Sequence, residues 1–165
     1  MSTIPSLKIT IIDDDASMRT MLEDFIRQKY PLVVLATYET GEDALQQISG
    51  EENLIVLDYN LDSIQQGGMN GVEVFRKLKE RFPAIPVIFI SGQEKSEVAA
   101  NTFKLGAQDY IIKNENIFKR LDTTLNQILG KATNAKMASK QRLRLAVVLI
   151  LAFSLLITLL VWNNR

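Results

Sequence analysis

The chain contains no cysteine and no histidine among its 165 residues. Without cysteine it has no disulfide framework, no thiolate metal site and no cysteine nucleophile. Without histidine it has no imidazole to act as an acid, a base or a metal ligand, and it cannot itself carry phosphohistidine. Any chemistry must therefore come from carboxylates, hydroxyls, lysine and arginine.

Glycine and proline are also scarce, at 8 and 4 residues, while hydrophobic residues make up 47% and charged residues 23% of the chain. This balance is typical of a globular protein and not of a disordered one. The length leaves room for one ordinary domain and an appendage.

The formal net charge of zero hides an uneven distribution of charge. Residues 131–165 carry six basic side chains and no acidic one, which leaves 13 basic against 19 acidic side chains in residues 1–130. An acidic body with a basic tail is unlike the usual nucleic-acid binder, so we expect no nucleic-acid partner.

Apolar runs alternate with helical patterns along the first 130 residues. The runs that predict strands are residues 7–12, 32–36, 54–57, 87–90 and 110–112. The periodicity predicts helices over residues 16–29, 41–48, 71–82, 94–105 and from Asn116 onward. Strands that alternate with helices predict an α/β fold with a doubly wound, five-stranded parallel sheet.

Polar side chains stand at the carboxyl ends of four of these predicted strands. Asp13 and Asp14 follow the first, and Asp58 ends the third, which is apolar enough to be buried on both faces. Ser91 follows the fourth strand and Lys113 the fifth. The carboxyl ends of parallel strands share one edge of a sheet, where open α/β sheets bind their ligands. We therefore expect these side chains to converge.

Carboxylates gathered in a small cleft repel one another unless a cation neutralises them. Mg²⁺ suits such a cleft because it binds one or two carboxylates together with carbonyls and waters. Lys113 adds a second positive charge, Ser91 offers a hydroxyl and Asp58 can act as a nucleophile. Together these groups predict a site for a transferred phosphoryl group.

The order and spacing of five short motifs resemble those of the response-regulator receiver domain, from Leu7 to about Gly130. The motifs are Ile11-Ile12-Asp13-Asp14, Leu57-Asp58, Ile90-Ser91-Gly92, Gly106-Ala107 and Tyr110-Ile111-Ile112-Lys113. The resemblance implies a flavodoxin-like sheet with strand order 2-1-3-4-5 and a receiver domain over residues 1–130.

By this resemblance, Asp58 is the phosphoacceptor and takes its phosphoryl group from a histidine kinase or phosphotransfer protein. The implied Mg²⁺ ligands are Asp13, Asp14, Asp58 and the backbone carbonyl of Asn60. An aspartate-nucleophile phosphatase is set aside, because it needs an acid at the position of Asn60, and an amide cannot transfer the proton.

The resemblance also implies roles for the groups around the phosphoryl group. Lys113 would pair with it, Ser91 would hydrogen-bond it, and Tyr110 would be the aromatic that turns inward with the switch. Phosphorylation would then change the surface around the fourth helix, fifth strand and fifth helix. Core packing alone is the alternative for Tyr110, and Asp15 is expected to cap the helix that starts at Ala16.

Two departures from the family pattern stand out. Asn114 follows Lys113 where members usually have proline in a cis peptide, and a cis bond to asparagine would cost about 2.5–4 kcal/mol, so we expect a different turn. The loop after Asp58 is longer than usual and has Asp62 where proline is common. Its segment Asp62–Gly68 is either a solvated loop or a means of changing access to Asp58 or contacting a partner. Gln93 lies where the family tunes hydrolysis.

Leu145 to Trp162 contains no charged residue and only two hydroxyl side chains. At ~1.5 Å per residue a helix over this run would span about 27 Å, close to the ~30 Å of a bilayer core. We predict a transmembrane helix over residues 145–162, after a basic linker or helix extension over 131–144 and before a short tail over 163–165. The alternative is a hydrophobic coil that pairs chains in solution.

Five basic residues precede this run and one follows it. The positive-inside rule then predicts a single-pass tail anchor in the cell inner membrane, with the receiver domain in the cytoplasm. The predicted function is a membrane-anchored, stand-alone response regulator that signals through protein contacts and has no separate enzymatic output. Its downstream partner would be a protein in a membrane complex, with a homodimer left open. The alternative is a receiver-like scaffold at the membrane that acts without phosphorylation.

Overall fold

The structure is a computed structural model that describes residues 7–61, 68–92 and 96–163, without the side chains of 96, 132–137, 140, 151–161 and 163. The chain divides into two compact units, Met1–Leu129 and Gly130–Arg165. The predicted loop segment Asp62–Gly68 therefore falls almost wholly outside the described residues, as does Gln93.

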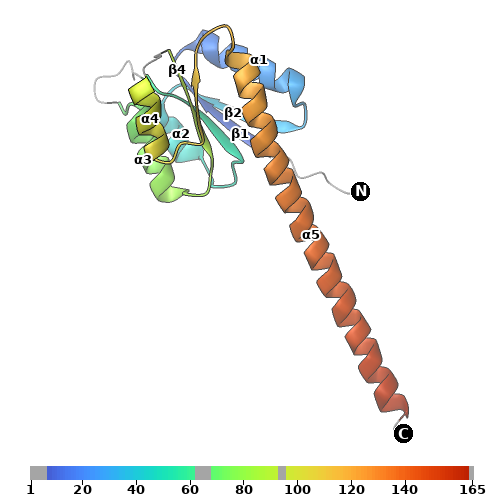
Figure 1. Cartoon of the computed structure of the whole chain (residues 1–165). Coiled ribbons are helices and arrows are strands. Elements are labelled where there is room, and N and C mark those ends of the chain that lie inside the picture. The colour runs from blue at the N-terminus through green and yellow to red at the C-terminus, as the bar shows by residue number, and fades with distance from the viewer. Residues whose placement is uncertain (1–6, 62–67, 93–95, 164–165) are drawn as a thin grey trace. The chain divides into compact units, whose positions relative to one another are not determined.

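A five-stranded sheet forms the centre of the first unit (Figure 1). Its strands are β1 (Leu7–Ile12), β2 (Val33–Tyr38), β3 (Leu54–Asp58), β4 (Val87–Ser91) and β5 (Asp109–Ile112). All four neighbouring pairs are parallel, and the strand order is β2-β1-β3-β4-β5. The predicted parallel sheet and its order are confirmed.

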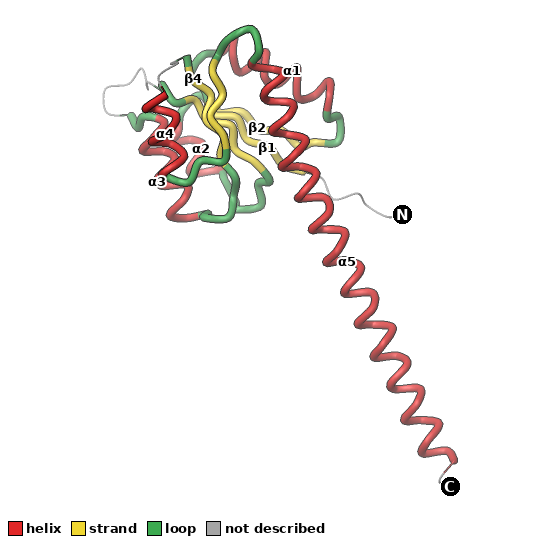
Figure 2. Tube along the Cα trace, in the orientation of Figure 1, coloured by secondary structure: helices red, strands yellow, loops and turns green. Residues whose placement is uncertain are grey.

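Helices cover both faces of this sheet (Figure 2). They are α1 (Ala16–Lys29), α2 (Gly41–Gln47), α3 (Gly71–Arg81), α4 (Ser96–Lys104) and α5 (Ile117–Asn163). Apolar side chains of α1 and of the start of α5 pack in one core cluster, and those of α2 and α3 pack in the other, with α4 against it. The apolar spacing after Asn116 predicts five inward side chains on the last helix, and all five are buried: Ile117, Leu121, Leu125, Ile128 and Leu129.

Helix starts follow the expected capping chemistry. The side chain of Asp15 accepts hydrogen bonds from the backbone N–H groups of Ser17 and Met18, which confirms it as the cap of α1. Asn70 and Glu73 form a capping box at the start of α3, the helix that follows the loop after Asp58. Both caps fix the residue at which their helix begins.

Two details of the predicted elements were wrong. The apolar spacing over residues 16–29 predicts Met21 on the inner helical face with Leu22 and Ile26. Met21 is instead 46% exposed, because Leu22 and Ile26, one helical turn apart, define the inner face of α1 and Met21 is offset from it. The second strand was predicted over 32–36 but runs from Val33 to Tyr38, while Leu32 is exposed. Pairing with β1 sets these bounds, since the ladder runs without a break from Val33 to Tyr38.

The turn after β5 is built around Asn114. Among the described residues no peptide bond is cis, so the bond from Lys113 to Asn114 is trans, as expected. The N–H of Lys113 donates to the carbonyl of Ser91 at 2.7 Å. The side chain of Asn114 accepts from the N–H of Asn116 at 3.0 Å, and its carbonyl accepts from the N–H of Ile117. Asparagine thus supplies a side-chain acceptor that proline lacks.

The second unit, Gly130–Arg165, is helical as far as Asn163. Its described apolar side chains, among them Leu143, Val148, Ile150 and Trp162, are exposed. Within the described part of the chain, no helix is both long enough and apolar enough to cross a membrane. Most of the span predicted over residues 145–162 lies on side chains outside that description.

Candidate functional site

The register of the sheet brings the carboxyl ends of four strands to one level. Asp58 pairs with Ile90, and Ser91 pairs with Ile112, the residue before Lys113. Ile12, the residue before Asp13, pairs with Leu57, the residue before Asp58. Residues far apart in the sequence therefore converge at one edge of the sheet.

Three carboxylates meet at this edge. Asp13, Asp14 and Asp58 each place a carboxylate oxygen within 4.8 Å of the others. Asp13 is 1% exposed and Asp58 4% exposed, while Asp14 is half-buried. Such close, poorly hydrated carboxylates repel one another strongly when they are all ionised.

Lys113 bridges two of these carboxylates. Its Nζ lies 2.9 Å from Asp13 Oδ2 and donates to Asp58 Oδ2 at 3.0 Å. Burial lowers the pKa of Lys113, but the contacts with Asp13 and Asp58 outweigh burial and leave that pKa raised. Lys113 is therefore charged at neutral pH, and its one ammonium contacts two of the three clustered carboxyl groups.

The pKa and contacts of Asp13 show that the charge of Lys113 only partly compensates the carboxylates. Burial raises the pKa of Asp13, the contact with Lys113 lowers it and the neighbouring Asp58 raises it, with a net increase. Its buried Oδ2 receives no hydrogen bond, because Lys113 lies at ion-pair distance without hydrogen-bond geometry. An unsatisfied carboxylate oxygen in an all-oxygen cluster fits a hard divalent cation, so the cluster fits the usual Mg²⁺ site of a receiver domain.

Asn60 lies in the turn that directly follows β3. Its N–H donates to Asp58 Oδ1 at 3.1 Å, and the N–H of Tyr59 donates to the carbonyl of Ile90 at 2.8 Å. The turn thereby orients the carboxylate of Asp58. The role of the Asn60 carbonyl as a metal ligand stays a prediction.

Ser91 and Tyr110 are joined by a hydrogen bond between their hydroxyls. Ser91 is fully buried and Tyr110 is 6% exposed, so the phenol points inward. Burial raises the pKa of Tyr110, and the bond from Ser91 offsets only part of this, so the phenol keeps its proton at neutral pH. The two residues predicted to act together in the switch are therefore in direct contact.

Two residues at this edge were not predicted from the sequence. The ring of Tyr59 lies against the rings of Phe89 and Tyr110, with centroids 5.8 and 6.1 Å apart. Gly71 starts α3 so close to β3 that a Cβ atom there would lie 2.2 Å from the carbonyl oxygen of Asp58. In the sequence, the aromatic residue directly after Asp58 and the glycine at the start of the α3 helix could have indicated that these two positions belong to the site.

The fold and the site together define a doubly wound, flavodoxin-like protein with an acidic cation site and a buried lysine at the carboxyl edge of its sheet. The response regulator receiver domain family matches residues 9–126. The chain belongs to this family.

Curated relatives match at moderate identity. A protein-glutamate methylesterase/protein-glutamine glutaminase of Bacillus subtilis is 29% identical over 140 residues, covering 82% of this chain and 38% of that protein. The transcriptional regulatory protein ZraR of Salmonella typhimurium is 33% identical over 135 residues, covering 81% of this chain and 29% of ZraR. The chain thus spans less than two-fifths of the length of either relative.

Solved structures agree on the fold. The response regulator DrrB of Thermotoga maritima is 26% identical with a TM-score of 0.63, covering 77% of this chain and 54% of that chain. A CheY-like receiver domain protein from Methanospirillum hungatei has a TM-score of 0.65 at 21% identity, covering 79% of this chain and 98% of that chain. The second likeness shows the fold alone.

Proposed function

We propose that the chain accepts a phosphoryl group on Asp58 from a histidine kinase or phosphotransfer protein and signals through protein contacts. Receiver domains typically interact with such donors. The observation that carries the proposal is the position of the Asp58 carboxylate, between Lys113 Nζ at 3.0 Å and the carboxylates of Asp13 and Asp14. This arrangement pairs a nucleophile with a cation site and a second positive charge.

In the proposed transfer, a carboxylate oxygen of Asp58 forms the new bond to phosphorus. The phosphorus–nitrogen bond of the donor phosphohistidine breaks, its electron pair stays on the imidazole, and the imidazole takes a proton from water. Bound Mg²⁺, held by Asp13, Asp14 and Asp58, would supply charge neutralisation for the phosphoryl oxygens. Lys113 would exchange its contact with Asp58 for one with the phosphoryl group.

Ser91 and Tyr110 would carry the change to the surface. The Ser91 hydroxyl would donate to a phosphoryl oxygen on Asp58; in support, Ser91 ends β4, the strand that pairs with the strand of Asp58. A groove of about 410 Å³ lies beside Tyr110 and is lined from β5, the following turn and α5 by side chains that include Ile112, Asn116 and Lys119. We assign contact with a downstream protein to this surface.

The test uses the full chain with Mg²⁺ and a small-molecule phosphodonor, read by intact mass. We expect a gain of one phosphoryl group that is absent in Asp58→Ala and absent when the metal is chelated. Asp24→Asn, a change of an exposed carboxylate on α1, should still load. Absence of the adduct in the unmodified chain, together with no response of the fold to beryllofluoride, would contradict the proposal.

The alternative function is a receiver-like scaffold whose acidic site is intact but unused. The trans turn at Asn114 and the long loop after Asp58 favour it, because both depart from the family pattern. The same mass measurement separates the two functions, since the scaffold gains no adduct.

The output is proposed to be a contact and not an enzymatic reaction. The relatives named above include a methylesterase and a transcriptional regulator, and this chain covers only 38% and 29% of them. The match lies in the receiver region, residues 9–126. We therefore do not assign the activities of these relatives, or a nucleic-acid partner, to this chain. A homodimer formed through the receiver domain stays a further proposed contact.

We also propose that residues 145–162 anchor the receiver domain to the cell inner membrane from the cytoplasmic side. The support is the uncharged run from Leu145 to Trp162 and the excess of basic residues before it. The anchor would place the receiver beside a membrane complex that contains its downstream partner. Membrane association that survives removal of residues 140–165 would contradict this.

A further inference from the structure

Helices α2 and α3 lie side by side on one face of the sheet and pack in the same core cluster (Figure 1). They approach most closely near their first residues. A Cβ atom on Gly41, the first residue of α2, would lie 2.1 Å from Cγ2 of Val74 on α3. Only a residue without a side chain allows this approach. The start of α2 is therefore held tightly against α3.

Glu42, the next residue of α2, reaches the chain just before α3. Its Oε1 accepts a hydrogen bond from the backbone N–H of Met69 at 2.7 Å, although the two residues are 27 positions apart. Both are half-buried, and Met69 packs against the core cluster that the two helices share. Hydrogen bonds to a carboxylate are stronger than those between neutral groups. Helix α2 thus holds the backbone two residues ahead of Gly71.

Three consecutive residues lead from this contact to the reactive edge. Met69 is held from α2, Asn70 caps α3 with a capping box, and Gly71 lies against β3. A Cβ atom on Gly71 would come within 2.2 Å of the carbonyl oxygen of Asp58 and 2.8 Å of that of Tyr59. The start of α3 therefore lies directly against the backbone that carries the carboxylate of Asp58.

The chain leaves this edge of the sheet through the turn at Asn60. The N–H of Asn60 donates to Asp58 Oδ1 at 3.1 Å, and residues of the turn and of the start of α3 line one groove of about 420 Å³. Eight residues separate Asn60 from Met69 in the sequence. A connection of this length does not itself determine how the chain returns, because each residue keeps its backbone freedom until a contact restricts it. The contact with Glu42 supplies such a restriction.

We propose that Glu42 is a positioning residue for the Mg²⁺ site. By holding the N–H of Met69, it keeps the start of α3 against β3 and so maintains the arrangement of Asp58 and the turn at Asn60. The role assigned to Glu42 rests on the proposed function, in which Asp58 and its neighbouring carboxylates hold the metal. Groups that orient metal ligands typically change metal affinity about 10-fold to 100-fold. Glu42 acts through the backbone, so we expect the lower end of this range.

The test is NMR of the isotopically labelled full chain, with two readouts that do not depend on phosphorylation. Hydrogen exchange of the Met69 amide reports the hydrogen bond, and a titration with Mg²⁺ followed at the Asn60 amide reports the metal affinity. Glu42→Ala removes the acceptor. Glu42→Gln keeps an acceptor oxygen at the same reach without the charge, whereas Glu42→Asp keeps the charge on a shorter side chain. Glu80→Ala is the matched control, because Glu80 is an exposed carboxylate of α3 that lines a groove together with Glu42 and Met69.

In the unmodified chain we expect slow exchange of the Met69 amide. In Glu42→Ala and Glu42→Asp this exchange should be at least about tenfold faster, the factor that a hydrogen bond to a charged group corresponds to. The dissociation constant for Mg²⁺ should rise about tenfold in both variants. Glu42→Gln should recover most of both losses, since its amide oxygen accepts from the same N–H. Glu80→Ala should match the unmodified chain in both readouts.

Three results would overturn the inference. One needs no variant: fast exchange of the Met69 amide in the unmodified chain. Another is a Glu42→Ala chain, shown by circular dichroism to be folded, that binds Mg²⁺ as tightly as the unmodified chain. The third is an effect that follows the charge, with Glu42→Gln as weak as Glu42→Ala and Glu42→Asp equal to the unmodified chain. Failure of Asp58 to gain a phosphoryl group by intact mass would instead contradict the proposed function, while the exchange and the Mg²⁺ titration would still decide the role of Glu42.

Discussion

Lys113 lies between two carboxylates that have almost no contact with water, so its removal should be costly. In Lys113→Met, Asp13 and Asp58 lose the cation that lies 2.9 and 3.0 Å away. Removing one partner of a buried ion pair leaves an uncompensated charge, and we expect a loss of about 3 kcal/mol in the free energy of unfolding. The measurement is urea denaturation at neutral pH in the presence of a chelator.

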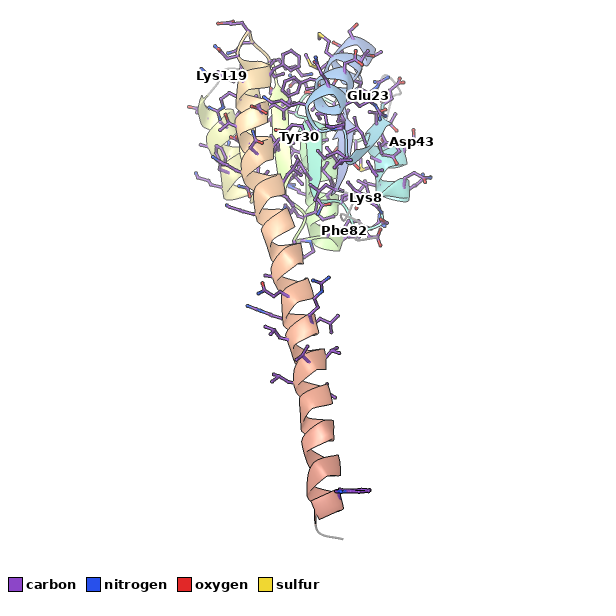
Figure 3. All side chains as sticks on the ribbon, turned by 90° about the vertical axis from the view of Figure 1, so that its right-hand side faces the viewer. Lys8, Glu23, Tyr30, Asp43, Phe82 and Lys119 are labelled. Carbon is purple, nitrogen blue, oxygen red and sulfur yellow. The ribbon has the colours of Figure 1, made fainter. Side chains whose placement is uncertain are left out.

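Lys119→Met is the matched control, since Lys119 is exposed on α5 (Figure 3) and the same change there should stay within ~0.5 kcal/mol of the unmodified chain. Combining Lys113→Met with Asp13→Asn should recover part of the lost free energy of unfolding, because one of the two uncompensated buried charges is then removed. Equal stability of Lys113→Met and the unmodified chain would show that Lys113 does not compensate these carboxylates.

Gly71 sets how closely α3 approaches β3, the strand that ends in the proposed phosphoacceptor Asp58. A Cβ atom at this position would lie 2.2 Å from the carbonyl oxygen of Asp58, which is backbone and cannot rotate away. Gly71→Ala should therefore displace the end of β3, lower the free energy of unfolding by about 1–3 kcal/mol and reduce phosphoryl loading. Gly130→Ala is the control, because a Cβ atom there meets nothing within 4 Å. Loading and stability equal to those of the unmodified chain would contradict this prediction.

At the scale of elements, α1 and α5 are tied by Asp122. It accepts a hydrogen bond at 2.7 Å from the phenol of Tyr30, which is labelled in Figure 3, and pairs with Lys29 at 2.6 Å. Lys29 ends α1 and Tyr30 is its C-cap. The contact with Lys29, followed by that with Tyr30, lowers the pKa of Asp122 below its ordinary 3.8. A carboxyl group with a lowered folded-state pKa stabilises the fold above its unfolded pKa, and this contribution is lost as pH falls through the folded value.

Asp122→Asn should therefore be less stable than the unmodified chain at pH 7, and the difference should shrink as the pH falls below 3.8. Thermal unfolding of both proteins across this pH range measures the difference directly. Asp24→Asn, a change of an exposed carboxylate on α1, is the control and should match the stability of the unmodified chain at pH 7. A difference between Asp122→Asn and the unmodified chain that is independent of pH would rule out the charge of Asp122 as its cause.

The elements also show what the sequence could and could not predict. Asp58 was recognisable because a carboxylate ends a run that is otherwise fully apolar, and Lys113 because a cation ends the last short strand. The contact between Tyr59 and Tyr110 was not predictable, since it depends on two strand registers and on the direction of both rings. The start of β2 was missed because the exposed Leu32 looks apolar in sequence, while pairing with β1 begins at Val33.

At the scale of the whole molecule, the distribution of acidic residues follows the division of the chain into two compact units. The acidic residues all lie within residues 1–130, and the compact receiver unit ends at Leu129. The residues proposed for phosphoryl transfer to Asp58 all belong to the first unit. We therefore expect phosphoryl loading to be independent of the second unit, whereas membrane association should depend on it alone.

The anchor can be tested by flotation of the full chain with vesicles that contain anionic lipid. Val148 and Ile150 are exposed residues within the apolar run, and an aspartate at the centre of a membrane-spanning helix costs about 2.5–3.5 kcal/mol. The double change Val148→Asp with Ile150→Asp should abolish flotation and leave phosphoryl loading at Asp58 intact. Val148→Leu with Ile150→Leu should float like the unmodified chain. If the aspartate variant floats equally well, the apolar run does not anchor the protein; a loss of both flotation and loading would show that the two units are not independent.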